Sequence, residues 1–381
     1  MDTSARRRTW PRLLLVIPAA GLLVLGLVAG LLLMGVALPI VSARLPELHS
    51  ALMVFGFVGT LISLERAVAL RAAWAYAAPA LLAAGTILAL TPVPVIAGQA
   101  AIAVGMAVHA LQYRAIWARQ PMTATAIQGL GAVTGLVAAV VWCAGVPAPR
   151  LVPLLAVFLI LTITGERLEL ARIAAPGIRA ERLLFALSLA LSAVAILSLT
   201  TPVVAVPVAG ILLLGVVAWL LRYDVARATV RMPGLPRYVA VCLLAGYAWL
   251  AVAGAGWLLG GARTEGVIYD ATTHAVFLGF VITMIMAHAP VILPAVLGVR
   301  IPYHVALYVP VALLQLSLLV RVVVGDAWGL TLGLRAGGIG AAVAILGFGV
   351  TVVVVLLRAG RAARAARTAP TRERSRGRVP A

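Results

Sequence analysis

The sequence predicts an all-α protein, a polytopic membrane bundle of about twelve transmembrane helices. Of the 381 residues, 64% are hydrophobic and only 11% are charged, which is far more apolar than a soluble globular domain. The apolar residues occur in long runs, separated by short stretches rich in Pro, Gly and Arg. The first run, residues 13–38, is too long for the apolar part of a cleavable signal peptide, so we expect it to stay as a membrane anchor.

Twelve apolar runs can cross a hydrocarbon core of roughly 30 Å at about 1.5 Å per residue. They cover residues 13–38, 47–70, 74–91, 94–116, 122–145, 151–172, 181–200, 203–221, 238–260, 270–296, 302–324 and 336–357. Residues 1–357 therefore form one domain whose partner is the lipid bilayer. Residues 358–381 are basic and rich in Ala, and we expect a disordered tail on the anionic inner leaflet. Cys143 and Cys242 lie near opposite ends of their spans, which excludes a disulfide between them.

The arginines predict which way the helices face. All 30 basic residues are Arg, and 25 of them fall in the N-terminal arm, the even-numbered connections and the tail. Basic residues accumulate on the cytoplasmic side, so we expect a multi-pass protein of the bacterial inner membrane with both termini in the cytoplasm. The net charge of +19 then reflects orientation and not binding of nucleic acid.

Two short patterns lie in the first half of the chain. The spacing E-R-x4-R occurs at residues 65–71 and 166–172, at the cytoplasmic ends of spans two and six. It predicts ion-paired anchors at the interface, or a proton relay as the functional alternative. Gly26 and Gly30 form a GxxxG pattern, which predicts a helix-packing face in span one.

The histidines are the strongest functional signal. His49 and His274 lie at the outer ends of spans two and ten, whereas His109, His288 and His304 lie in the inner half of the membrane. Ionisable residues inside a membrane are costly and mark functional sites, although a single histidine is more often a hydrogen-bonded core residue. Two imidazoles at matching depth on different helices suit the axial positions of one b-type haem, with the apolar bundle around the porphyrin.

Two further features support a haem at the outer side. Gly56 follows His49 by seven residues, which in an α-helix returns to nearly the same face and would leave room for the macrocycle. Haem propionates need cations, and Arg44, Arg321 and Arg335 flank spans two, eleven and twelve on the outer side. The alternative for each arginine is simple interfacial anchoring.

The inner histidines admit two interpretations. Three imidazoles from His109, His288 and His304 suit copper or zinc. In the structural interpretation, His288 bonds a carbonyl freed by Pro290 and His304 sits at the interface.

The string THAVFLGFVITMIMAHAPVILPAVLGVRIP (residues 273–302), followed by LLQLSLLVRV (residues 313–322), resembles the NnrS family. That family consists of twelve-span bacterial proteins described as containing haem and copper and tied to nitric oxide metabolism. Histidines at the outer ends of spans two and ten also resemble subunit I of haem-copper oxidases, whose low-spin haem is held there. The resemblance implies a metal-binding protein with iron in haem b, and copper or a second haem, which takes part in electron transport or in nitric oxide or metal handling. Its partners would be an electron donor or a small gaseous ligand.

The sequence departs from the oxidases in two places. The H-x-H of their helix ten is absent, because Thr272 and Val276 flank His274, and spans six and seven contain no histidine. Reduction of oxygen at a binuclear centre is therefore not expected.

Two other classes of function fit the same layout. Twelve spans are equally ordinary for a secondary transporter, and Gln99, Gln112, Gln128 and Gln315 could line its path. A scaffold whose histidines bind nothing is the third alternative. The sequence contains no Walker A motif, no H-E-x-x-H and no nucleophile elbow.

Overall fold

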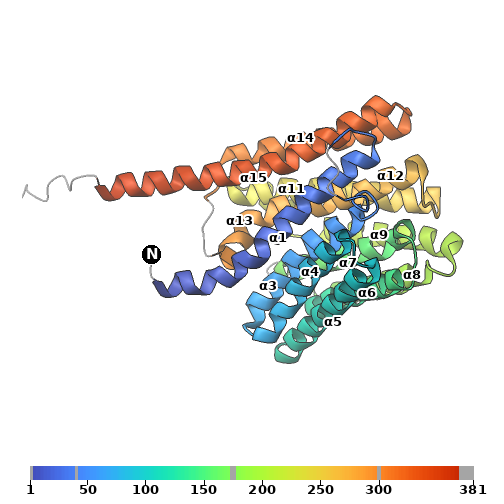
Figure 1. Ribbon diagram of the computed structural model, residues 1–381, viewed down its shortest axis with the longest axis horizontal. Coiled ribbons are helices and arrows are strands. Elements are labelled where there is room, and N and C mark those ends of the chain that lie inside the picture. Colours follow the sequence, from blue (N-terminus) through green and yellow to red (C-terminus); the bar gives the residue numbers. More distant parts are fainter. Residues whose placement is uncertain (1–2, 39–41, 172–176, 298–301, 369–381) are drawn as a thin grey trace, which may run out of the picture.

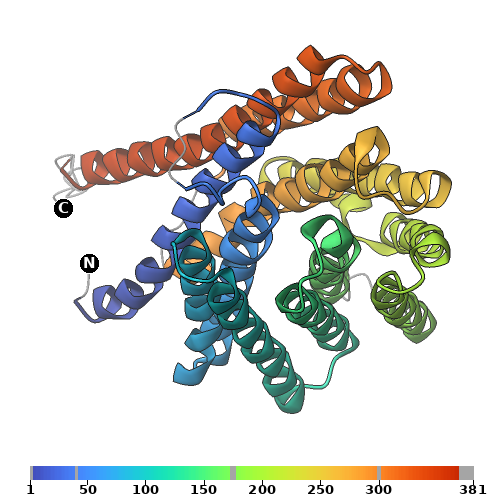
Figure 2. The same ribbon diagram turned by 45° about the vertical axis from the view of Figure 1, so that its right-hand side comes forward.

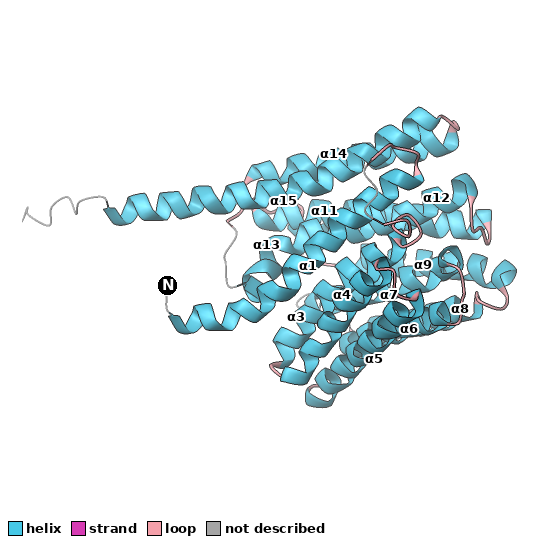
Figure 3. Cartoon of the chain, in the orientation of Figure 1, coloured by secondary structure: helices cyan, strands magenta, loops and turns pink. Residues whose placement is uncertain are grey.

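The computed structural model describes residues 3–38, 42–171, 177–297 and 302–368, and all regular secondary structure in these ranges is helical (Figure 3). Within them, 12 helices are long and apolar enough to cross a membrane. The predicted all-α polytopic bundle is confirmed.

The first half of the chain contains α1 (Thr3–Leu33), α2 (His49–Ala51), η1 (Leu52–Gly59), α3 (Thr60–Leu70), η2 (Ala73–Tyr76), α4 (Ala77–Leu90), α5 (Val95–Arg119), α6 (Thr123–Cys143) and α7 (Ala148–Ala171). The second half contains α8 (Ile178–Leu197), α9 (Pro202–Tyr223), α10 (Ala226–Thr229), α11 (Leu235–Gly260), α12 (Gly266–His274), η4 (Ala275–Ile282), α13 (Thr283–Leu297), η5 (Val305–Leu307), α14 (Tyr308–Leu319), η6 (Val320–Ala327) and α15 (Thr331–Thr368).

Helix α7 is the most deeply packed span, between α6, α8 and α9 and against η4 (Figures 1 and 2). In its most apolar stretch 89% of the residues are buried, and the spans that begin at His49 and Gly266 follow with 67% and 72%. The spans that carry most of the polar candidates are therefore the ones best shielded from lipid.

The two ends of the bundle carry different polar groups. The end with His49, His274 and Arg321 is called the His49 end below, and the end with Arg66 and Arg167 is called the Arg66 end. The start of α1 and the far end of α15 both project on the side of the Arg66 end (Figure 1). The two ends of the described chain thus lie on one side, as an even number of spans requires.

Three spans widen into π-helices, η1, η4 and η6, in which hydrogen bonds run from residue i to i+5. The string G-F-V-x-T occurs at residues 56–60 and 279–283. Its first four residues end η1 and η4, and the Thr after each π-helix bonds the carbonyl oxygen five residues earlier. Thr60 Oγ1 donates to Phe55 O at 3.3 Å, and Thr283 Oγ1 donates to Leu278 O at 3.3 Å. The repeated string is therefore also a structural repeat.

The role predicted for Gly56 is wrong. A Cβ atom at Gly56 would lie 2.9 Å from Thr86 Cγ2 and 3.1 Å from Leu22 Cδ1, so this glycine faces α4 and α1 and not an open space. The reason is the π-helix between the two residues. Its wider turns rotate the chain by fewer degrees per residue, so seven residues no longer return to the face of His49.

Two predicted boundaries also change. The first helix ends at Leu33 and not at residue 38, because Gly35 adopts φ +73° and Val36 N bonds Leu31 O, the backbone pattern that closes a helix. At the other end, α15 continues to Thr368, so residues 358–368 are helical and not disordered. The rest of the predicted tail, 369–381, lies outside the described residues. Cys143 and Cys242 are free thiols, as predicted.

Candidate functional site

A cavity of about 300 Å³ lies at the His49 end, between α1, α7, α15 and the spans that begin at His49 and Gly266. This volume is at the lower end of the range for sites that hold small molecules. Its walls are mostly Leu, Val, Ile, Met and Ala, and its polar lining consists of His49, Ser50, Tyr269, Asp270, Thr273, His274 and Arg321. The structure thus brings the two outer histidines to one cavity.

Helix α1 positions His49 through its GxxxG pattern. The Nδ1 atom of His49 lies 2.8 Å from Gly26 O. A carbonyl oxygen can only accept, so Nδ1 carries the ring proton and Nε2 of the neutral ring keeps its lone pair. A Cβ atom at Gly30 would lie 2.9 Å from His49 Cε1, so the second glycine makes space for the ring. Sequence reasoning missed this role of Gly26 and Gly30.

His274 is held in the same way by its own helix. Its Nδ1 lies 2.8 Å from Asp270 O and 3.2 Å from Asp270 Oδ1, and both oxygens accept. The proton is therefore on Nδ1 and the lone pair on Nε2. Among the described residues, neither His274 Nε2 nor His49 Nε2 has a hydrogen-bond partner.

An ion pair borders the cavity beside His274. Arg321 donates to both carboxylate oxygens of Asp270, from Nε at 2.8 Å and from Nη2 at 2.7 Å, and its Nη1 lies 3.0 Å from Met34 Sδ. Asp270 therefore links Arg321 to His274. The signal for Asp270 was in the sequence, because it is an acidic residue in an apolar segment, four residues before His274 and so on the same helix face.

The three predicted outer cations have different places. Arg321 lines the cavity. Arg335 donates to the backbone oxygen of Met34 at 3.0 Å, and Met34 is itself part of the cavity wall. Arg44 donates to Thr91 O and Val93 O, at 2.8 and 2.6 Å, and does not line the cavity.

The structure does not bring the inner histidines together. His109 is fully buried in α5 and bonds Gln112, whereas His304 lies at the start of η5, where its Nδ1 accepts a hydrogen bond from Ala306 N at 3.1 Å. His288 bonds Met284 O through Nδ1 and faces Arg167 Nη1 at 3.2 Å through Nε2. Among the described residues, no group of three or more His, Cys, Asp or Glu side chains is placed to hold a metal ion.

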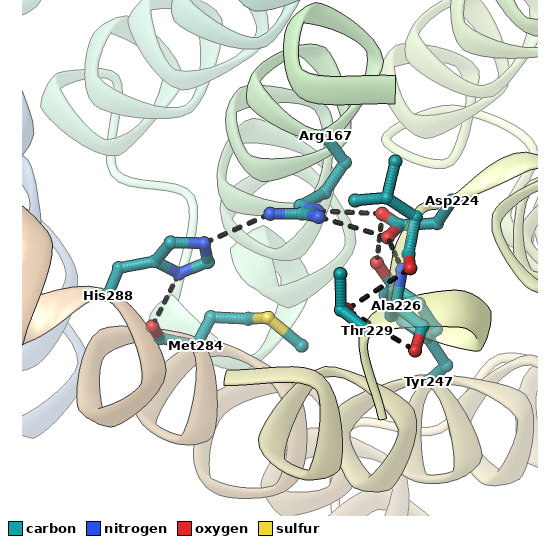
Figure 4. Close-up of polar contacts among 8 residues, drawn as sticks. Arg167, Asp224, Ala226, Thr229, Tyr247, Met284 and His288 are labelled. Carbon is teal, nitrogen blue, oxygen red and sulfur yellow. Dashed lines mark hydrogen bonds and ion pairs between the residues drawn. The ribbon is translucent and has the colours of Figure 1, made fainter. Parts of the chain in front are cut away.

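The partner of His288 belongs to a buried ion pair at the Arg66 end (Figure 4). Arg167 donates to Asp224 from Nε at 2.7 Å and from Nη2 at 2.9 Å. Asp224 also accepts from Tyr247 Oη at 2.8 Å and from Ala226 N at 2.7 Å. This network joins α7, the turn after α9, α11 and α13, and no pattern in the sequence predicts the pairing across 57 positions.

Residues of both E-R-x4-R copies form ion pairs, but the prediction of an interfacial anchor fails for Arg167. Arg66 pairs with Glu65 and, at 3.3 Å, with Glu166 of the second copy. Arg167 is not an interfacial anchor, because only 3% of its side chain is exposed and its partner lies inside the bundle. Arg172 lies outside the described residues.

No curated protein and no solved structure matches this chain. One family model does match, that of a domain of unknown function (DUF8744), over residues 12–357. The match covers eleven spans in full, the twelfth up to residue 357, and both polar regions described above, so the chain belongs to the DUF8744 family.

Proposed function

We propose that this protein binds one b-type haem in the cavity at the His49 end and transfers electrons through it, with His49 and His274 as axial ligands. One observation carries the proposal: two imidazoles on one cavity, each with Nδ1 held by a carbonyl oxygen and with Nε2 free of hydrogen bonds among the described residues. Metal-bound histidines have this arrangement, because the bond at the other ring nitrogen fixes both the tautomer and the orientation of the ring.

The surroundings of the two rings suit the same group. Aliphatic side chains and Phe277 would contact the porphyrin, and Arg321 would supply positive charge for a propionate, partly offset by Asp270. Haem would supply one-electron chemistry. If both histidines held the haem, neither ligand position would be left for a gas, which would favour electron transfer over handling of nitric oxide.

The absorption spectrum of the purified protein tests this proposal. Expression with adequate haem supply should yield a coloured protein with the narrow reduced bands of a low-spin b-type haem, close to one per chain. A protein without haem absorption under these conditions contradicts the proposal. The secondary transporter would then be the better candidate, although the polar lining of the cavity lies at the His49 end, and the part of the cavity that reaches mid-span, beside Leu159 and Ile282, is apolar.

Gly30 offers a test with a matched control in the same helix. Gly30→Ala should lower haem content clearly, because the new Cβ would lie 2.9 Å from His49 Cε1 and push the ring. Gly21→Ala has nothing within 4 Å and should keep full haem content, with a small gain in helix stability. Haem per chain is measured for both variants. Equal haem content in the two would mean that Gly30 does not position His49.

We also propose that the protein lies in the bacterial inner membrane with the Arg66 end at the cytoplasm. The support is the placement of 25 of the 30 arginines on one side. A reporter fused at Ala381 should then be active in the cytoplasm, and one inserted at Gly266 in the periplasm. A tail that reports from the periplasm would invert this orientation and put the haem at the cytoplasmic face.

A further inference from the structure

Unpaired polar atoms gather inside the Arg66 end of the bundle. Five side-chain atoms there are buried and lack a hydrogen-bond partner among the described residues: Arg66 Nε, His109 Nε2, Tyr113 Oη, Gln128 Nε2 and Thr164 Oγ1. They come from α3, α5, α6 and α7, which pack against one another in sequence order. Each buried polar atom without a hydrogen-bond partner lowers the stability of the fold by about 1–3 kcal/mol. Five such atoms together therefore predict bound partners that are not side chains.

The hydrogen bonds of Gln112 determine what His109 needs. Gln112 Nε2 lies 3.0 Å from Ser63 O and 2.7 Å from Ala75 O. Carbonyl oxygens only accept hydrogen bonds, so it is the amide N–H groups of Gln112 that point to them. Its Oε1 therefore faces His109 Nδ1, at 2.8 Å, and must accept the Nδ1 proton. His109 Nε2 is then an acceptor, fully buried, that lacks a donor.

The other atoms of the group supply hydroxyls and donors from α5 itself and from the helices packed beside it. The rings of His109 and Tyr113 are in edge contact, with centroids 5.1 Å apart. Arg66 lies on α3, which packs against the helix α5 that carries both residues. Gln128 packs on Gly165, the neighbour of Thr164, where an added Cβ would lie 2.5 Å from Gln128 Cγ.

This mixture of groups selects one ligand. An anion would leave the His109 lone pair unmet, and a cation would face Arg66 with no carboxylate beside the histidine. Water both donates and accepts, and buried water commonly makes about three hydrogen bonds to groups of this kind. The side chains of Arg66, Glu65 and Glu166 are 13%, 24% and 20% exposed, which gives the group an opening at the Arg66 end.

We propose that internal water molecules occupy this group and form a hydrated path from the Glu65–Arg66–Glu166 ion cluster to Tyr113 and His109. The path would carry water and protons from the Arg66 end into the half of the bundle opposite the haem cavity. It does not depend on haem, because none of its residues lines that cavity.

Radiolytic labelling of the intact protein in detergent micelles tests the proposal. X-ray pulses make hydroxyl radicals from water, so a buried side chain is oxidised only when water is bound beside it. The structure offers matched controls in Tyr238 and Tyr247, which are fully buried, as Tyr113 nearly is at 2%, but whose hydroxyls donate to Met286 O and Asp224. Tyr113 should be oxidised several-fold faster than both controls. Oxidation of Tyr113 as slow as that of the controls would overturn the proposal.

A variant then tests the role of the histidine. His109→Leu removes the acceptor while keeping an apolar side chain of similar size, and it should reduce labelling of Tyr113 while leaving Tyr238 and Tyr247 unchanged. Unchanged labelling of Tyr113 in this variant would remove His109 from the path. Should the variant not fold, the wild-type comparison decides alone.

Discussion

Replacing His49 or His274 with alanine is expected to abolish the low-spin haem spectrum of the purified protein. Each ring would provide one axial nitrogen, and its hydrogen bond at Nδ1 already fixes the orientation that a ligand needs. Loss of such an outer-shell bond alone typically costs about 10- to 100-fold in metal affinity, so loss of the ligand itself should exceed about 100-fold. Haem per chain and the low-spin signals in absorption and electron paramagnetic resonance spectra measure the effect.

Two other histidines serve as controls for this experiment. His288→Ala and His304→Ala should retain the complete haem and metal content of the wild type, because these rings bond Arg167 and Ala306 and do not line the cavity. A loss of haem or metal from His288→Ala, with the haem content of His49→Ala equal to that of the wild type, would contradict the assignment. The inner histidines would then be the better candidates for the ligands.

The fold could be predicted from the sequence because the membrane imposes it. Backbone groups in lipid must bond within their own segment, so long apolar runs become helices. The depth of each histidine followed from the same count of spans, and two histidines at equal depth, His49 and His274, do line one cavity. The depth of a residue along a helix follows directly from its position in the sequence. The sequence therefore predicts that His49 and His274 lie at the same level.

The face of a helix on which a residue lies is harder to predict from the sequence than its depth. Regular α-helical turns put Gly56 on the face of His49, whereas the π-helix η1 rotates it away. Depth alone groups the three inner histidines, yet His109 turns toward Gln112 and His288 toward Arg167. Which residues meet across the bundle depends on helix packing, and neither composition nor spacing contains that information.

Breaking the Arg167–Asp224 ion pair is expected to be the most destabilising change at the Arg66 end. The two side chains are 3% and 1% exposed, and Arg167→Met would leave the Asp224 carboxylate buried with Tyr247 and Ala226 N as its partners among the described residues. Removing one member of a buried pair typically costs about 3–5 kcal/mol, because the remaining charge is not compensated. The same substitution also removes the N–H group that faces His288 Nε2. Unfolding of the protein in detergent, followed by denaturant titration, measures the loss.

A second substitution separates the charge from the lost packing. Asp224→Asn removes the buried charge, and its amide oxygen can still accept from Ala226 N, so the double variant Arg167→Met/Asp224→Asn should be more stable than Arg167→Met alone. Arg237→Met provides the exposed control, since Arg237 makes one bond to Val230 O, and it should change stability by no more than about 0.5 kcal/mol. If Arg167→Met is as mild as Arg237→Met, the buried pair does not hold α7 to α9 and α11. If instead it is severe and Asp224→Asn fails to relieve it, the stabilisation comes from the packing of the Arg167 side chain and not from its charge.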